Sequence, residues 1–404
     1  MALRVEEIAA TLRVVFTADA TRRHSHKVLM LNGRRIVFVL GNLELGGAER
    51  QALILARYLS EHEQAAVEIW GFNKSGPVAE ICEQHGLPWR VIPYPFTEPL
   101  PNRFRGLLRV CRSLRQAKPD ILLPYTFGPN IVCGLIWKWT GARACVWNQR
   151  DEGIVPFSSP SVRWAAKLTP HFISNCEPGA RFLTEKLGVD AAKVTVIRNG
   201  IESVAPESDR RAWRERLAVD ERSFVACMVA NLHNNKDHPT LLRAWRKVVN
   251  EFGVNGRSAV LVLAGRHDGA YESLVSIVNE LKIRENVRFA GHVSDVAGLL
   301  SAADVSVFSS RSEGCPNAVL ESMAAGLPVA GTDIEGIRDV VGPTGAQFLA
   351  PLEDAESLAE VLLKLAKDPA LCARIGAENR ANVRDHYDSL RMCRETAALL
   401  ASIQ

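Results

Sequence analysis

The sequence has no long apolar run and no paired cysteine motif. No stretch of its 404 residues approaches the roughly 18 consecutive apolar residues of a membrane-spanning helix, so we expect no such helix. The nine cysteines are an odd number, lie among apolar residues and form no Cys-x-x-Cys pair. This pattern predicts reduced, mostly buried thiols in a cytoplasmic protein. The first residues also lack the apolar core of a secretory signal.

Strong charge of either sign is absent as well. The formal net charge is only +4 and the isoelectric point is about 8.6. This balance argues against a dedicated nucleic-acid binder, so no nucleic-acid partner is expected. A length of 404 residues, 47% of them hydrophobic, predicts two globular domains.

From residue 34 onward, short apolar runs alternate with helical segments, which predicts an α/β fold with parallel sheets wrapped by helices. The expected parts are an N-terminal extension at 1–33, a first Rossmann-like domain at 34–203, a second Rossmann-like domain at 204–380 and a C-terminal helix at 381–404. The first strand ends in a loop whose Gly47 lets a ligand approach the start of the next helix. The loop is not the Gly-x-Gly-x-x-Gly of dinucleotide enzymes, which argues against an oxidoreductase.

The segment 309–329 is the most informative stretch. An apolar run at 303–308 predicts a buried strand, and Pro316 followed by helix formers up to Gly326 predicts a helix directly after it. A helix that begins beside the carboxyl end of a strand presents unpaired backbone N–H groups, which form a site for phosphate. The residues expected to present them are Asn317, Ala318 and Val319.

Two carboxylates flank this predicted phosphate site. Glu313 lies in the loop and Glu321 lies about one turn into the helix. Because phosphates repel a carboxylate that has no hydroxyl to bind, we expect Glu321 to meet a ribose diol and Glu313 to meet a sugar ring. The ligand implied is a nucleotide sugar. The simpler alternative is an ordinary loop acid and an acid stabilised by the helix dipole.

The pattern Glu-Gly-x-Pro-Asn-x-x-x-Glu-Ser-Met-Ala-x-Gly-x-Pro-Val, which begins at Glu313, resembles the donor-site motif of retaining glycosyltransferases with the GT-B fold. The resemblance implies two Rossmann-like domains that face each other across a cleft, the second holding the nucleotide sugar and the first the acceptor. It also implies that Glu313 contacts the donor sugar, Glu321 the ribose and the helix amides the diphosphate. Similar Gly-Gly-Ala-Glu loops, here containing Gly47, open these enzymes beside the donor phosphates and the acceptor.

Other residues are expected to complete the donor site. Lys236 is the best cation for a diphosphate leaving group, and Arg266 is a second candidate. The family usually places an arginine a few residues before such a lysine; here Asn231 or His233 stands in that place. The loop that, by resemblance, holds the nucleotide base through backbone groups contains His292 and Val293. No Asp-x-Asp motif lies beside this site, so we expect neither a metal ion nor another cofactor.

Three residues are candidates for the acceptor side. Tyr125 stands where many relatives have a histidine, and Arg150 and Asp151 follow the next strand. Tyr125 can hydrogen-bond a sugar or acceptor hydroxyl. The alternatives are that Tyr125 packs in the core and that Arg150, Asp151 and Glu152 form a surface salt-bridge set.

A basic helix is predicted at 103–118, with six arginines and lysines beside an apolar face. Such a helix either rests on an anionic membrane surface or is an ordinary outer helix with a solvated basic face. Peripheral contact with the inner face of a membrane is therefore one of two hypotheses for this helix.

Together, the residues and the resemblance predict a cytoplasmic, metal-independent enzyme of polysaccharide or glycoconjugate biosynthesis. It would transfer a sugar with retention from a nucleotide sugar, with a UDP-sugar favoured, to a hydroxyl of a saccharide, a lipid-linked sugar or a small molecule. Glu313 and Lys236 are the predicted catalytic residues. An epimerase of the same fold and a non-catalytic nucleotide-sugar-binding protein are the alternatives.

Overall fold

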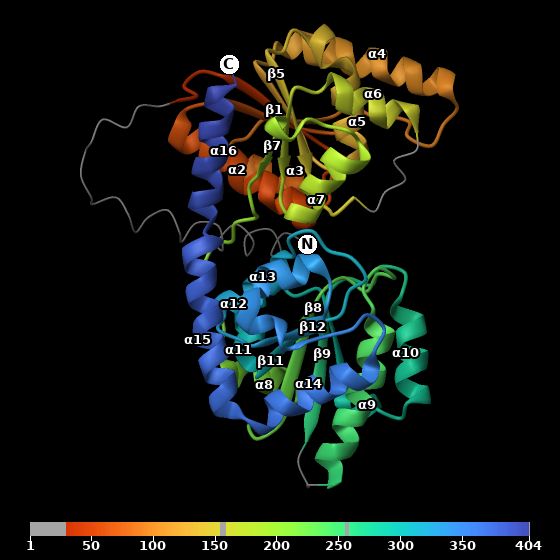
Figure 1. Ribbon diagram of the computed structural model, residues 1–404, viewed down its shortest axis with the longest axis vertical. Helices are drawn as coiled ribbons and strands as arrows, with labels where there is room; N and C mark the ends of the chain where they lie inside the picture. The colour runs from red at the N-terminus through yellow and green to blue at the C-terminus, as the bar shows by residue number, and fades with distance from the viewer. Residues whose placement is uncertain (1–29, 154–158, 255–257, 404) are drawn as a thin grey trace, which may run out of the picture. The chain divides into compact units, whose positions relative to one another are not determined.

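The computed structural model describes residues 30–153, 159–254 and 258–403 (Figure 1). The chain forms two compact units. Unit 1 runs up to Gly200 and resumes at Asp388, and unit 2 is Ile201–Tyr387. The sequence placed these divisions after residues 203 and 380. Most of the expected extension, residues 1–29, lies outside the described ranges.

In the described part of unit 1, seven strands form one sheet in the order β3-β2-β1-β4-β5-β6-β7, and all neighbours run parallel. Most of its central strands are buried on both faces, as expected for a sheet covered by helices on each side. The strands are β1 Arg35–Leu40, β2 Ala66–Gly71, β3 Trp89–Val91, β4 Ile121–Pro124, β5 Ala144–Gln149, β6 His171–Ser174 and β7 Val194–Val196.

Helices cover both faces of this sheet. One face packs against α2 Gly47–Glu63, α3 Pro77–Gln84 and α16 Ser389–Ser402. The other face carries α4 Leu100–Ala117, α5 Phe127–Thr140 and α6 Pro160–Leu168. Beyond β6, α7 Glu177–Arg181 continues as a π-helical turn, Phe182–Lys186, and a 3₁₀ turn, Ala191–Lys193, precedes β7.

Two distant parts of the chain complete the core of unit 1. Leu31 is fully buried in the cluster formed by β1, α2 and α3, so this unit includes residues before 34. The same cluster contains four side chains of α16, and Figure 1 shows α16 beside α2. These side chains are Met392, Cys393, Ala397 and Leu400.

In the described part of unit 2, six strands form a parallel sheet in the order β10-β9-β8-β11-β12-β13. The strands are β8 Phe224–Val229, β9 Ala259–Ala264, β10 Val287–Gly291, β11 Val305–Phe308, β12 Val329–Thr332 and β13 Leu349–Ala350. The helices are α8 Arg210–Arg216, α9 His238–Val254, α10 Tyr271–Glu280, α11 Val296–Ala302, α12 Asn317–Ala324, α13 Glu335–Ala346, α14 Ala355–Lys367 and α15 Pro369–His386, with a 3₁₀ turn at Arg284–Asn286. Two Rossmann-like sheets of this kind confirm the predicted α/β fold class.

The C-terminal segment differs from the single helix that we expect at 381–404. It forms α15 and α16, which are separated at Tyr387 and Asp388. The carboxylate of Asp388 accepts a hydrogen bond from the amide of Arg391 at 3.1 Å and so caps the start of α16. The break lies where the chain leaves unit 2 and returns to unit 1.

In the described ranges, no helix is both long and apolar enough to cross a membrane. All nine cysteines lie within these ranges as free thiols, and most are buried. Burial raises the pKa of the Cys82 thiol to about 12.

Candidate active site

The predicted donor residues of unit 2 follow strands that end at one edge of the sheet. Strands β8 and β11 are neighbours, so the loop that contains Lys236 and the loop that contains Glu313 begin side by side. The carboxyl edge of such a sheet is where α/β proteins bind their ligands. The topology therefore brings the two predicted catalytic residues together.

The ammonium group of Lys236 donates a hydrogen bond to Oε1 of Glu313 and forms an ion pair with it. Both side chains are mostly buried, with 20% of Lys236 and 15% of Glu313 exposed. The hydroxyl of Ser310 donates to the same carboxylate oxygen at 2.7 Å. Lys236 Nζ also lies 5.0 Å from the centroid of the Phe308 ring, within the range of a cation–π contact. A cation and a hydrogen-bonded carboxylate are thus held at the end of β11.

Backbone hydrogen bonds join the two loops. The amide of Asp237 donates to the carbonyl of Ser309 at 3.2 Å, and the amide of Arg311 donates to the carbonyl of Asn235 at 3.1 Å. The amide of Ser310 donates to Thr332 Oγ1 at 3.2 Å, which fixes this loop to the end of β12. These hydrogen bonds hold the loops of Lys236 and Glu313 together. The contribution of Ser310 is not predicted by the sequence.

Behind this pair lies a second charged group that the sequence analysis missed. The carboxylate of Asp237 is 1% exposed and accepts from Arg311 Nη2 at 3.4 Å, while Arg311 also pairs with Glu353. A signal was present in the sequence, because Asp237 directly follows Lys236 and Arg311 lies two residues before Glu313. Their pairing depends on the approach of the two loops.

The start of α12 differs in one respect from the prediction. Pro316 is the N-cap residue, and its carbonyl accepts from the amides of Val319 at 3.1 Å and Leu320 at 3.2 Å. The prediction that Val319 presents an unpaired N–H is therefore wrong. Among the described residues the amide of Ala318 has no acceptor, so it stays a candidate for phosphate binding. Asn317 and Glu321 lie in the same helix and are partly exposed.

The remaining donor candidates lie on exposed loops of the same unit. His233 is exposed, and its Nδ1 accepts from the amide of Asn235 at 3.1 Å, which assigns the ring hydrogen of a neutral His233 to Nε2. Arg266 and His292 are exposed and Val293 is partly buried, on the loops that follow β9 and β10. All three therefore follow strands of the sheet that contains β8 and β11, at its carboxyl edge.

In unit 1, Gly47 is the first residue of α2 and is exposed. Gly46 caps this helix without a side-chain hydrogen bond, and its carbonyl accepts from the amide of Arg50 at 3.0 Å. The glycine-rich loop thus leads from β1 into α2 at the carboxyl edge of the unit 1 sheet, as expected.

The same edge carries Tyr125 and Arg150, which follow the neighbouring strands β4 and β5. Tyr125 is fully buried, and burial raises the pKa of its hydroxyl although the nearby Arg150 opposes this change. The guanidinium of Arg150 lies over its ring and donates to Oδ1 of Asn199 at 3.2 Å and of Asn148 at 3.3 Å. In the described part of the chain no carboxylate pairs with Arg150. Its positive charge is therefore held by neutral amides.

Asp151 does not pair with Arg150 and has hydrogen-bond partners of its own. Its carboxylate accepts from Gln149 Nε2 at 2.7 Å and from the amide of Gly153 at 2.8 Å, and burial raises its pKa. Arg150 and Asp151 therefore do not pair with each other, because the hydrogen-bond partners of each are neutral groups. Tyr125 packs on Phe38 with ring centroids 5.8 Å apart, while its hydroxyl meets no described partner.

The described residues do not group three or more His, Cys, Asp or Glu side chains in a way that could hold a metal ion. Among the groups that the described part of the unit 2 site can offer to an anion are the ammonium of Lys236 and the amide of Ala318. Glu313 can accept from hydroxyls. This is the chemistry of a site for a phosphate ester of a polyhydroxyl compound.

Comparison with known proteins agrees with this chemistry. Residues 209–382 match the profile of the glycosyl transferases group 1, and residues 45–203 match that of glycosyltransferase family 4. The two matches cover most of unit 2 and most of unit 1. They include Lys236, Glu313 and Glu321 in the first and Tyr125 and Arg150 in the second.

The chain is 27% identical to the Escherichia coli UDP-Gal:alpha-D-GlcNAc-diphosphoundecaprenol alpha-1,3-galactosyltransferase, over 66% of this chain and 71% of that protein. It is also 27% identical to the Bacillus anthracis N-acetyl-alpha-D-glucosaminyl L-malate synthase. This match covers 46% of this chain and 48% of that enzyme, so it spans about half the length of the enzyme. Among solved structures, Anabaena HepE in complex with UDP and glucose has the same fold. It gives a TM-score of 0.79 at 20% identity, over 91% of this chain and all of HepE. Together with the motif at Glu313, these matches show that the chain belongs to the GT-B glycosyltransferases of the group 1 and family 4 type.

Proposed function

We propose that this protein transfers a sugar from a UDP-sugar to a hydroxyl of a saccharide or lipid-linked acceptor in the cytoplasm, with retention of the anomeric configuration and without a metal ion. The observation that carries the proposal is the contact between Lys236 and Glu313 at the carboxyl edge of unit 2. It joins a cation suited to a diphosphate with a carboxylate suited to sugar hydroxyls, beside the start of α12.

In this reaction the bond between the anomeric carbon and the diphosphate oxygen breaks, and its electron pair leaves with the nucleotide. Lys236 and the amide of Ala318 stabilise the developing negative charge, a role that requires no change in their own bonding. The acceptor oxygen attacks on the face from which the diphosphate leaves, and the acceptor proton passes to a diphosphate oxygen. Glu313 orients the sugar by accepting from its hydroxyls and forms no covalent bond.

Donor binding would change the partners of Lys236. In the structure its ammonium pairs with Glu313. A diphosphate would compete for Lys236, and sugar hydroxyls would replace it as donors to the carboxylate. Ser310 would hold Glu313 during this exchange, because its hydrogen bond depends on neither ligand.

The choice of UDP is supported by two of the comparisons. The Escherichia coli relative is named for a UDP-galactose donor, and the HepE structure contains UDP. The exposed loops with Arg266, His292 and Val293 would meet the nucleotide.

On the acceptor side, Arg150 supports an acceptor with an anionic group. Its guanidinium is partly buried, and among the described residues it contacts the side-chain amides of Asn148 and Asn199 and the ring of Tyr125. A charge held this way can still form an ion pair with a phosphate or carboxylate. The acceptor named for the Escherichia coli relative contains a diphosphate.

The test is a donor screen with UDP-, GDP- and ADP-sugars in the presence of EDTA, in which nucleotide release is followed with and without saccharide and lipid-linked acceptors. Wild type is compared with Glu313→Ala and Lys236→Met. Lys247→Met is the matched control, because Lys247 is an exposed lysine of α9 that pairs with Glu356.

We expect nucleotide release that depends on the acceptor, requires Glu313 and Lys236 and continues in EDTA. The product should have the donor's anomeric configuration. Release of nucleotide and an altered free sugar without any acceptor would identify an epimerase. Tight binding of one donor without turnover would indicate a binding protein, and loss of activity with EDTA would refute metal independence.

A further inference from the structure

Three neighbouring helices of unit 1 carry no acidic residue. Helices α4, α5 and α6 cover one face of the sheet and contain eight arginines and lysines, but no aspartate or glutamate. The basic residues are Arg103, Arg105, Arg109, Arg112, Arg115, Lys138, Arg163 and Lys167. The helices on the opposite face, α2, α3 and α16, have acids among their charges. We call the first set the α4–α6 face.

Large apolar side chains are exposed on this same face. On α4, Leu100 is 74% exposed, Phe104 61% and Leu108 42%. Trp139 in the last turn of α5 and Trp164 on α6 are also mostly exposed. Among the described residues of unit 1, Met30 is the one other large apolar side chain exposed to this degree. The apolar exposure of this unit is therefore concentrated where acids are absent.

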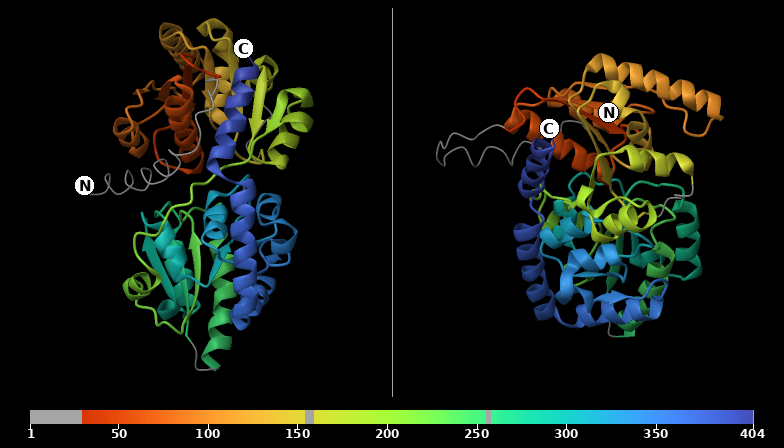
Figure 2. Two further views of the ribbon diagram at one scale, coloured as in Figure 1. Left: turned by 90° about the vertical axis from the view of Figure 1, so that its left-hand side faces the viewer. Right: turned by 45° about the horizontal axis from the view of Figure 1, so that its top comes forward.

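The exposed apolar and basic side chains of helix α4 lie in adjacent rows along the helix. Leu100, Phe104 and Leu108 follow one another at intervals of four residues, so they form a single stripe along the helix. The exposed Arg105, Arg109 and Arg112 lie beside this stripe by their spacing, and Val110 and Leu114 face the sheet. Figures 1 and 2 show α4, drawn in orange, along the outside of unit 1.

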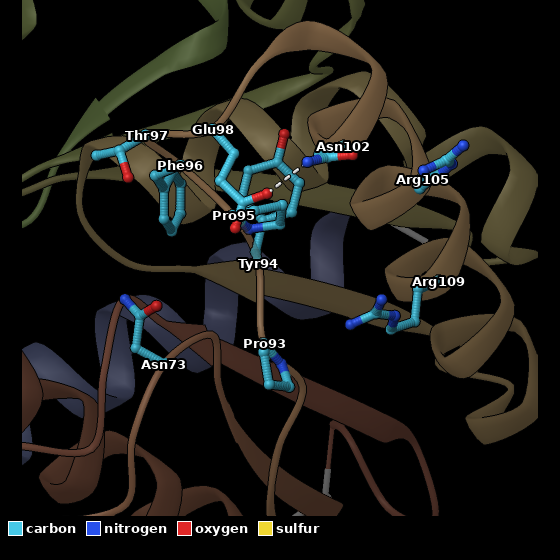
Figure 3. A pocket seen from close by; sticks show the side chains of 10 residues that line it. All are labelled: Asn73, Pro93, Tyr94, Pro95, Phe96, Thr97, Glu98, Asn102, Arg105 and Arg109. Carbon is cyan, nitrogen blue, oxygen red and sulfur yellow. Dashed lines mark hydrogen bonds between the residues drawn. The ribbon is translucent and has the colours of Figure 1, made fainter.

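A cavity of about 610 Å³ opens beside the arginine side of α4 (Figure 3). Its walls include Arg105 and Arg109 and the aromatic rings of Tyr94 and Phe96, which follow β3. Its one acidic wall residue, Glu98, accepts a hydrogen bond from Asn102 at 2.7 Å. The cavity thus places two guanidinium groups beside apolar ring surface.

We propose that the α4–α6 face docks on an anionic lipid bilayer, with α4 in the plane of the membrane surface. The arginines would attract anionic headgroups, the stripe of Leu100, Phe104 and Leu108 would enter the acyl boundary, and a lipid phosphate would occupy the cavity beside Arg105 and Arg109. A helix that binds this way combines an apolar face with a basic polar face, and tryptophan favours the interface between lipid and water. This docking goes beyond the proposed transfer reaction and does not depend on it.

Charge complementarity selects the bilayer as the partner. An ordinary solvated helix has no need of a stripe of three exposed apolar side chains, and a face that carried only arginines would suit any polyanion. Here both features occur together on α4. A second copy of this chain fits less well, because two such basic faces would repel each other.

The experiment is flotation of the full chain with vesicles, without donor or acceptor. Phosphatidylcholine vesicles are compared with equimolar phosphatidylcholine and phosphatidylglycerol vesicles. One variant replaces the stripe, Leu100→Ser, Phe104→Ser and Leu108→Ser, and a second replaces charge, Arg105→Gln, Arg109→Gln and Arg112→Gln. The matched control replaces three exposed arginines of unit 2, Arg211→Gln, Arg374→Gln and Arg384→Gln, and so changes the net charge equally.

We expect binding to the anionic vesicles that weakens with salt. The charge variant should lower the partition constant by roughly a hundredfold, because each of the three basic residues near an anionic surface contributes on the order of 1 kcal/mol. The stripe variant should lower it as well, while the control should bind like wild type. Thermal unfolding followed by circular dichroism checks each variant. If the stripe variant unfolds early, Phe104→Ser alone replaces it.

Three results would overturn the proposal. The first is failure of the wild type to bind anionic vesicles at low salt. The second is an equal loss of binding in the unit 2 control, which would mean that bulk charge drives binding. The third is binding of polyaspartate or free glycerol phosphate with an affinity that matches vesicle binding and is unchanged in the stripe variant. This result would identify a soluble anion as the partner.

Discussion

The guanidinium carbon of Arg150 lies 4.5 Å from the centroid of the Tyr125 ring. The tyrosine is fully buried at the end of β4, and the arginine follows β5, so the contact joins two neighbouring strands at their carboxyl ends. A cation stacked on an aromatic face loses little of its ability to bind an anion at its outer edge. The outer edge of the Arg150 guanidinium is therefore where we expect the proposed acceptor to bind.

Replacing Arg150 by methionine should raise the KM for an anionic acceptor by roughly tenfold to a hundredfold, since hydrogen bonds to charged groups contribute about 1.5 to 3 kcal/mol. The KM for the donor should change little, because the donor is expected to bind in unit 2. Steady-state kinetics with each substrate varied in turn would measure both values. Arg143→Met, which removes an exposed arginine paired with Asp120, is the control. A shift in donor KM alone would contradict the assignment.

The hydroxyl of Ser310 should matter for catalysis through the carboxylate that it holds. Ser310→Ala removes the 2.7 Å hydrogen bond to Glu313, and we expect kcat/KM to fall by roughly tenfold while the melting temperature stays near that of wild type. Ser310→Thr, which keeps a hydroxyl, should recover most of the activity. Ser309→Ala changes the neighbouring buried serine, whose hydroxyl contacts the sulfur of Met228, and is the matched control. Equal losses in both alanine variants would point to general loop damage.

Gly336 should be intolerant of any side chain. A Cβ at this position would overlap the carbonyl oxygens of Glu313 and Gly314, so Gly336→Ala must displace the loop that carries the proposed catalytic carboxylate. We expect lower kcat and a lower free energy of unfolding. Gly253→Ala is the control, because a Cβ there meets no atom within 4 Å and alanine favours the helix by roughly 0.5 to 1 kcal/mol. Denaturant unfolding of the two variants should shift in opposite directions.

His238 makes the stability of unit 2 dependent on pH. Burial lowers its pKa from 6.5 to about 4, although the hydrogen bond to the backbone carbonyl of Lys236 opposes this change. The unfolded chain therefore binds a proton between about pH 6.5 and pH 4 that the folded chain does not. The free energy of unfolding should fall by about 2 to 3 kcal/mol as the pH drops through this window.

His238→Gln should remove this slope, which urea unfolding at several pH values would measure as the difference between wild type and variant. His386→Gln changes an exposed histidine at the end of α15 and is the control. An identical pH profile for wild type and His238→Gln would show that His238 is not the group responsible.

The sequence was sufficient to predict the fold and to assign Lys236 and Glu313 to one site, although it did not predict the ion pair between them. Both residues follow apolar runs that are recognisable as strands, and parallel strands place such loops at one edge. The details depended on distances that a sequence does not contain. Whether Val319 presents its amide depends on the turn at Pro316, and the role of Ser310 depends on a hydroxyl that meets one particular oxygen.

Other features of the structure that we did not predict have a recognisable pattern in the sequence. Asp388 followed by Ser389 is a strong helix-start pattern and marks the break between α15 and α16. The acid-free composition of α4, α5 and α6 is likewise visible in the sequence. What could not be seen was that Leu100, Phe104 and Leu108 stay exposed, because an amphipathic helix normally buries its apolar side chains.

The core of unit 1 contains α16, from the far end of the sequence, and this affects how the protein is made. A ribosome that has completed Gly200 has not yet synthesised Met392, Cys393, Ala397 and Leu400, which pack with α2 and α3 on one face of the sheet. At about 5 to 20 residues per second, translation of unit 2 takes roughly 10 to 40 s. During that interval the nascent first half exposes an apolar surface that only the last helix covers, so unit 2 can finish folding before unit 1 does.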